Sequence, residues 1–300
     1  MTEEEIQHFR AEVIAQKNLP TIPVVLAKIL QVCSNVDANS RHLITAIEED
    51  QALTGKMLRL ANSAFFGQSR RVATVPRAVI LLGFSTVRNL ALSVKVWDAL
   101  GAGIARSRLE VLWDHSLACA VAAKALVAGL RAGDPDQAFT AGLLHDVGRL
   151  LLAMRFRDEY WKVVGGVGES ELIDAVERKV FGVDHAEAGA WMLEAWALPP
   201  GIVESVRLHH DAPGRLTESR IVGLTDRLLG WTDLVTGEVG AQALELLEQM
   251  SEQGLTQEVW QVTLAQLRAG GKTTAFGLSS SDQGGRELAG RRRAGASRAA

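Results

Sequence analysis

The stretch "AGLLHDVGRLLLAM", residues 141–154, places a histidine and an aspartate side by side in an otherwise apolar segment. The segment has helical period, which predicts a helix over residues 136–155. Burying His145 and Asp146 costs free energy unless each side chain finds a partner. The groups that pair with these two side chains should therefore indicate the function, and we look for them in the rest of the chain.

The same helical period recurs along nearly the whole chain, and no run of alternating β-branched residues stands out. Examples are "VVLAKILQVC" from Val24, "QALTGKMLRLANSAFF" ending near Gly67, and "VPRAVILLGFSTVRNLALSVKVWDAL" with a break at Gly83. Further helices are expected at 109–130, 169–180, 185–196, 200–210 and 218–232, and a weaker pair at about 240–268. We therefore predict an all-α fold.

Composition and charge exclude several classes of protein. With 300 residues, 47% hydrophobic and 22% charged, the chain has an ordinary globular composition, and its net charge of −3 gives no argument for nucleic acid or anionic membrane. The two cysteines, Cys33 and Cys119, are too few for a disulfide framework or a thiolate zinc site. The start "MTEEEIQHFR" lacks the order of a signal peptide, and the longest apolar stretch, Leu117–Leu130, falls short of the roughly 20 residues of a membrane span. We expect a cytoplasmic protein.

Candidate partners for the pair lie in the second half of the chain. Each sits in or beside a predicted helix, and they are His115, His185, His209, His210 and Asp226. Imidazole and carboxylate together suit divalent iron, manganese, zinc or nickel, and such an ion would turn costly buried groups into ligands. Each residue also has a structural explanation: the two adjacent histidines could complement a helix C-terminus, and the aspartate could pair with Arg227.

The order of His115, His145–Asp146 and Asp226 resembles the HD superfamily of metal-dependent phosphohydrolases. His185 and the pair His209–His210 are similar to those of its two-metal branch, which includes the HD-GYP phosphodiesterases. The resemblance implies that one or two divalent ions are held by these seven residues. It stops at "HHDAPGRLTES", which lacks the continuation to Gly-Tyr-Pro, and at Arg149, which replaces the usual Lys. These differences affect substrate binding and argue against hydrolysis of a cyclic dinucleotide.

The first half of the chain indicates which branch of the HD superfamily the chain resembles. "LPTIPVVLAKIL", "EEDQALTGKMLRLANSAFFG" and "VPRAVILLGFSTVRNLALS" resemble the HDOD domain, the HD-related output domain of bacterial signalling proteins, with Asp50–Gln51 in place of the usual Asp-Pro. The resemblance covers about residues 18–235. It implies a helical N-terminal subdomain packed on an HD-superfamily-like helical bundle, with other signalling proteins as partners. Asn62 and Ser63 are expected to satisfy helix-end carbonyls or to cap the next turn.

The predicted organisation follows from these segments. It has an N-terminal helix or extension (1–17), the N-terminal helical part of an HDOD domain (18–100), the HD-like part with the candidate metal site (101–235), C-terminal helices (236–268) and a disordered Gly-, Ser- and Arg-rich tail (269–300). No oligomeric state follows from the sequence.

Three functional hypotheses remain. The first is a regulatory module that acts through protein–protein interaction, with or without metal. The second is a metal-dependent phosphohydrolase on a nucleotide or phosphoester, in which Arg149 stabilises the developing charge. The third is a di-iron site that senses dioxygen or redox state, since carboxylate-bridged iron is found in helical bundles.

Overall fold

The structure, a computed structural model, describes residues 2–15, 23–34, 39–63, 66, 71–167, 172–212, 214–234 and 236–270. Within these ranges the only extended pairing is an isolated bridge between Thr232 and Val239, so the all-α prediction is confirmed. Residues 271–300, which make up nearly all of the predicted disordered tail, lie outside the described residues.

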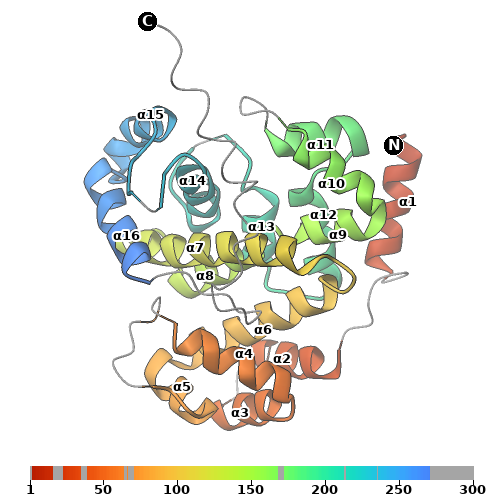
Figure 1. Cartoon of the computed structure of the whole chain (residues 1–300), viewed down its shortest axis with the longest axis vertical. Coiled ribbons are helices and arrows are strands. Elements are labelled where there is room, and N and C mark those ends of the chain that lie inside the picture. Colours follow the sequence, from red (N-terminus) through yellow and green to blue (C-terminus); the bar gives the residue numbers. More distant parts are fainter. Residues whose placement is uncertain are drawn as a thin grey trace, which may run out of the picture.

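Helices follow one another along the chain with short connections (Figure 1). Their bounds are α1 Glu3–Ile14, α2 Val24–Ser34, α3 Ser40–Glu48, α4 Gln51–Ala61, α5 Val75–Leu82, α6 Phe84–Leu100, α7 Arg106–Leu130, α8 Pro135–Leu144, α9 Val147–Phe156, α10 Asp158–Gly165, α11 Ile173–Phe181, α12 His185–Ala195, α13 Pro200–Arg207, α14 Glu218–Gly230, α15 Ala241–Met250 and α16 Gln257–Gly270. A single turn of 3-10 helix, Ser251–Gln253, separates the last two.

Helix α6 joins the two halves of the fold. On one side it packs against α2, α4 and α5, which lie with α3 at the bottom of Figure 1, and on the other it packs against α8 and α9. Trp97 on α6 meets Trp113 on α7 edge to face, with ring centroids 5.5 Å apart, and both rings are buried. The predicted break between α5 and α6 is confirmed at Gly83, whose φ of 86° a residue with a side chain rarely adopts.

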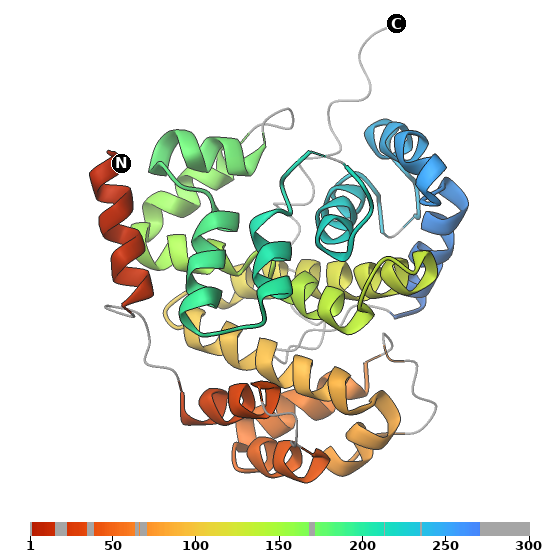
Figure 2. The same cartoon turned by 180° about the vertical axis from the view of Figure 1, so that it is seen from behind.

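The second half is built around α7. This helix packs against α8, α14 and α16, while α12 packs between α9 and α13 and is covered on its outer side by α1 (Figures 1 and 2). Because α7 crosses the centre of the bundle, a side chain on its inner face meets residues from α8, from α14 and from the turn between α8 and α9. This geometry gathers distant parts of the sequence around one point.

Helix α7 is long and apolar enough, by length and composition, to cross a membrane. At 25 residues it is longer than the apolar stretch Leu117–Leu130 recognised in the sequence, because the helix already begins at Arg106. However, 61% of its most apolar window is buried inside the protein, where α8 and α14 pack on it. Its apolar face is thus explained by the core of the bundle.

Three details differ from the sequence-based predictions. The helix predicted over 136–155 is two helices, α8 and α9, which are separated at the His145–Asp146 pair. Helix α4 ends at Ala61 rather than near Gly67, and α10 was not predicted.

The structural role expected for Asn62 is confirmed: its side-chain amide donates to the Leu58 and Val72 carbonyls at 2.6 and 2.7 Å, and its oxygen accepts from the Val72 N–H at 2.7 Å.

Candidate metal centre

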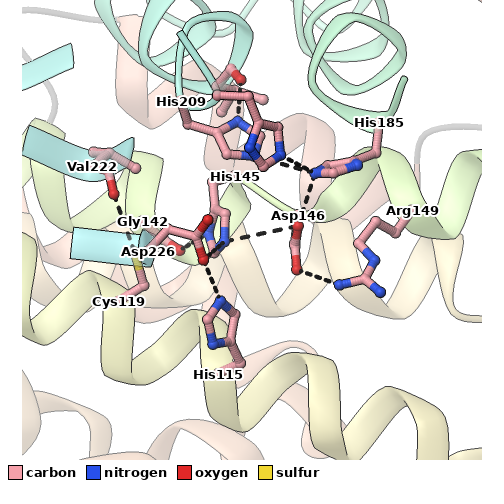
Figure 3. Close-up of polar contacts among 12 residues, drawn as sticks. His115, Cys119, Gly142, His145, Asp146, Arg149, His185, His209, Val222 and Asp226 are labelled. Atoms are coloured by element: carbon pink, nitrogen blue, oxygen red, sulfur yellow. Dashed lines mark hydrogen bonds and ion pairs between the residues drawn. The ribbon is translucent and has the colours of Figure 1, made fainter. Parts of the chain in front are cut away.

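The seven candidate ligands come together in the middle of the second half (Figure 3). Most of them lie at helix ends, where a side chain can point away from its own helix. They are His115 within α7, His145 and Asp146 between α8 and α9, His185 as the first residue of α12, His209 and His210 in the turn that follows α13, and Asp226 within α14. Residues separated by more than a hundred positions in sequence thus share one site.

Local backbone geometry aims the central pair into the site. His145 ends α8 with helical dihedrals (φ −57°, ψ −39°), and Asp146 follows with φ −90° and ψ 4°, which turns the chain before α9 begins. The turn lets two neighbouring side chains face the same interior point, which a continuous helix would not allow because adjacent residues diverge by about 100°. The break between α8 and α9 therefore allows both side chains to point into the same site.

Three imidazoles meet at one end of the site. The Nε2 atom of His185 lies 2.8 Å from Nε2 of His210 and 3.2 Å from Nε2 of His209. His185 and His209 are buried, and His210 is partly buried. Nδ1 of His185 faces a carboxylate oxygen of Glu177 and Nδ1 of His209 faces a carbonyl oxygen, so both Nδ1 atoms carry a proton and the neutral forms of these two imidazoles would direct Nε2 lone pairs at one another. A shared cation removes this conflict.

At the other end of the site, Asp226 connects two histidines. Its Oδ1 lies 2.8 Å from Nε2 of His115 and 3.6 Å from Nε2 of His145. Asp226 does not form the pair with Arg227 that was considered from the sequence. Arg227 instead donates to the backbone carbonyls of His210 and Asp211 at 2.6 and 2.7 Å, which leaves the Asp226 carboxylate directed into the site.

Asp146 lies between the two ends. Its Oδ1 is 3.2 Å from Nε2 of His185 and 3.8 Å from Nε2 of His145, and its Oδ2 accepts a hydrogen bond from Arg149 at 3.0 Å (Figure 3). Because Asp146 reaches both groups of histidines, the ligand atoms form one continuous cluster. Three overlapping subsets of this cluster each have their ligand atoms within 4.8 Å of one another.

Two of the histidines are oriented by backbone carbonyls through their Nδ1 atoms. Nδ1 of His145 lies 2.8 Å from the Gly142 carbonyl oxygen, and Nδ1 of His209 lies 2.6 Å from the Val206 carbonyl oxygen. A carbonyl oxygen only accepts, so each Nδ1 carries the proton and each Nε2 keeps its lone pair for the site. Nε2 of His145 is buried, and no hydrogen-bond partner for it exists among the residues that the structure describes. A buried acceptor left without a partner indicates a ligand position.

Burial and charge set the protonation states. Burial and the neighbouring histidines lower the pKa of His210 to about 3 and that of His209 well below its ordinary value. Burial would also lower the pKa of His185, but the Glu177 and Asp146 carboxylates outweigh it and raise this pKa to about 10. The pKa of Asp146 lies well below its usual range, because Arg149 and the histidines outweigh the effect of burial. In this state a proton on His185 supplies the positive charge at the centre of the cluster.

The residues fit a divalent metal ion. The cluster combines imidazole nitrogens with ionised carboxylates, which is the donor set of iron, manganese, zinc and nickel sites. The lowered pKa values of His209 and His210 keep these two imidazoles neutral, and Nε2 of neutral His145 and His209 directs its lone pair into the same interior, where a cation would satisfy them together.

Two residues of the site were missed by sequence reasoning. Glu177 on α11 is fully buried and accepts hydrogen bonds from His185, and Tyr160 on α10 is fully buried and donates to Glu177. A signal was present for the first, because Asp174, Glu177 and Phe181 follow the three- and four-residue spacing of one helix face. For the tyrosine no comparable signal exists in the sequence.

Comparisons with known proteins identify the family of this chain. The HDOD domain model matches residues 19–212. A protein of uncharacterised function from Treponema pallidum (strain Nichols) is 28% identical over 202 residues, which are 65% of this chain and only 38% of that protein. This chain thus spans well under half the length of that relative.

Solved structures show the same fold. The structure of a candidate phosphohydrolase from Shewanella amazonensis SB2B has a TM-score of 0.68 at 22% identity, covering 87% of this chain and 97% of its own. An HDOD domain protein of unknown function from Geobacter sulfurreducens has a TM-score of 0.66 at 24% identity, covering 91% of this chain and 92% of its own. The match to the family model extends over well more than half of the sequence, so this chain belongs to the HDOD domain family.

Proposed function

We propose that this protein is a regulatory module of bacterial signal transduction that holds one or two divalent metal ions in its His/Asp cluster and acts through contacts with other signalling proteins. Membership of the HDOD family supports the signalling role. The convergence of three imidazoles, with Nε2 of His209 and Nε2 of His210 both within 3.2 Å of His185 Nε2, supports the metal and is the observation that carries the proposal.

The charge balance of the site also supports a metal. A metal ion would take the place of the proton on His185. With all imidazoles then neutral, the three carboxylates of Asp146, Glu177 and Asp226 outnumber the guanidinium of Arg149 by two charges, which one divalent ion would balance. A bound ion would supply Lewis acidity and would tie together five segments of the bundle. Metal binding of this kind stabilises the folded state, so occupancy can be transmitted to the surface as a change in stability.

A phosphohydrolase is the second candidate. The donor set favours it, and so does the fold shared with the candidate phosphohydrolase of Shewanella amazonensis SB2B. Against it stands the position of Arg149, the residue that would stabilise charge on a substrate. Its guanidinium donates to Asp146 at 3.0 Å and to Tyr160 at 3.3 Å, and its side chain is only 16% exposed. Because this guanidinium is already bound to two side chains of the protein, it is not directed at a substrate, and this favours the regulatory module.

The test is elemental analysis of the purified full-length chain, combined with a screen for phosphodiesterase and phosphatase activity. We expect stoichiometric metal and no turnover. His209→Gln, which changes a buried imidazole of the cluster, should lose most of the metal. The matched control is His8→Gln on α1, because this imidazole is 71% exposed and lies outside the cluster; its metal content should equal that of the wild type.

Two results would overturn the proposal. Wild-type protein that contains no metal, and takes none up from iron, manganese, zinc or nickel salts, would exclude the metal-binding role. Turnover that disappears in His209→Gln but persists in His8→Gln would replace the regulatory module with the hydrolase.

A further inference from the structure

Five buried or nearly buried side chains form a closed ring beside the candidate ligands. Starting from Asp146, the ring runs to Arg149 (3.0 Å), then to the hydroxyl of Tyr160 (3.3 Å) and to Glu177 Oε1 (2.7 Å). It continues from Glu177 Oε2 to His185 Nδ1 (2.6 Å) and closes from His185 Nε2 to Asp146 Oδ1 (3.2 Å). The ring connects α9, α10, α11 and α12, and two of its members are candidate ligands.

Glu177 occupies the decisive position in this ring. Its Oε2 accepts both the backbone N–H of His185, at 2.8 Å, and the ring Nδ1 of the same residue. These two bonds hold the first residue of α12 against α11 and set how its imidazole is turned. With its Nδ1–H bound to a carboxylate, the imidazole directs Nε2 toward His209, His210 and Asp146. A carboxylate behind a histidine in this way orients a metal ligand and raises its basicity.

The burial of Glu177 is hard to explain by packing alone. A fully buried carboxylate is costly unless it is hydrogen-bonded, and an apolar side chain would fill the same space without that cost. Here three donors satisfy it: the N–H and Nδ1 of His185 and the hydroxyl of Tyr160. Two of these bonds hold the His185 imidazole in one direction, and the third holds the carboxylate that accepts them.

We propose that Glu177 is a positioning residue that holds His185 in the direction required for metal binding, and that Tyr160 and Arg149 brace it while Arg149 holds the Asp146 carboxylate from the opposite side. This inference rests on the metal-binding role proposed above. It assigns Arg149 to the support of the ligands instead of to a substrate. It also makes α10 and α11 the part of the surface that is linked directly to metal occupancy.

The test compares three variants of the full-length chain. Glu177→Gln keeps the size of the side chain but removes its charge, and Tyr160→Phe removes only the hydroxyl that braces it. Asp174→Asn is the matched control, because it changes a buried carboxylate on the same helix that pairs with Arg178 outside the ring. Affinity for Co²⁺ is measured from the visible absorption of the bound ion, and thermal unfolding is measured on each metal-free protein.

We expect Co²⁺ affinity to fall about 10- to 100-fold in Glu177→Gln and by a smaller factor in Tyr160→Phe, with an altered absorption spectrum in the first. Asp174→Asn should bind Co²⁺ as the wild type does. If Glu177 had only a structural role, Glu177→Gln would lower metal-free stability but leave affinity and spectrum unchanged, and that result would overturn the inference. Should Glu177→Gln not fold, unchanged affinity in Tyr160→Phe would overturn it instead. Failure of the wild type to bind Co²⁺ refutes the proposed function itself, which is a distinguishable result.

Discussion

Gly148 packs directly against the backbone of His185, so closely that a β-carbon on Gly148 would lie 1.9 Å from the His185 carbonyl oxygen. The same β-carbon would lie 2.7 Å from the backbone nitrogen of Gly189, one turn further along α12. This contact brings α9, which follows Asp146, against the first turn of α12, which carries His185. The distance between two candidate ligands is therefore set by the absence of a side chain at position 148.

Gly148→Ala should separate α9 from α12. Because the obstacle is backbone rather than a movable side chain, we expect a loss of about 1–3 kcal/mol in unfolding free energy, measured in urea, together with weaker metal binding. Gly129→Ala is the control, since nothing lies within 4 Å of a β-carbon at that exposed position of α7. It should raise stability by roughly 0.5–1 kcal/mol, as expected for Gly→Ala within a helix. Equal behaviour of the two variants would contradict this account of the contact.

Asp226→Asn tests whether stability depends on the metal. The Asp226 carboxylate lies among imidazoles, 2.8 Å from His115 and 3.6 Å from His145, and its ionised form would offset the charge of an ion. An amide of the same size binds metal more weakly. Removing the metal from the wild type with a chelator should lower the free energy of unfolding by about 3 kcal/mol if the ion is present at about 100 times its Kd. The free energy of unfolding of the variant should fall much less, because the variant begins with less metal bound.

Thermal melts of both proteins, each with and without chelator, measure this difference. A purely structural role for Asp226 makes a different prediction, in which the substitution lowers Tm equally under both conditions because the lost hydrogen bonds do not involve an ion. Chelator-independent destabilisation would thus remove this residue from the ligand set.

Much of the fold could be predicted from the sequence because its signals are local. Helical period marked most of the helices, and a glycine marked the break at Gly83. The break at His145–Asp146 had no such signal, because apolar residues at helical spacing continue on both sides of it. Helix α10 was missed for a related reason: it starts after Arg157, which has a positive φ of 52° at a position where glycine would be the usual signal.

The site was predictable to the extent that its chemistry is unusual. Histidines and aspartates within apolar helices stand out, and the resemblance to the HD superfamily placed them in one group; the structure brings all seven together. Glu177 shares a helix face with Phe181, but this spacing is a weak signal, since carboxylates are frequent on helix surfaces and only the tertiary structure buries this one. Its role depends on a hydrogen bond to a residue on the next helix, which local spacing does not reveal.

Asp50 provides a test of pH dependence far from the metal site. It caps α4 by accepting the Leu53 N–H at 3.0 Å and pairs with Lys95 of α6 at 2.9 Å. Burial would raise the pKa of Asp50, but the Leu53 N–H and Lys95 outweigh it, so the pKa lies below its ordinary value. A carboxyl whose pKa is lowered by folding stabilises the protein fully above its unfolded pKa of about 3.9, and this stabilisation is lost as the pH falls through the folded pKa.

Asp50→Asn should therefore destabilise the protein at pH 7 by about 1 kcal/mol, and the difference from wild type should shrink as the pH falls below about 5. Asparagine caps helices about as well as aspartate, so the substitution isolates the charge that faces Lys95. Urea unfolding of the wild type, Asp50→Asn, Lys95→Met and the double variant gives the coupling between the two residues at each pH. We expect favourable coupling at pH 7 that declines toward zero in acid. Coupling that stays constant down to the onset of acid unfolding would show that the pair contributes through packing instead of charge.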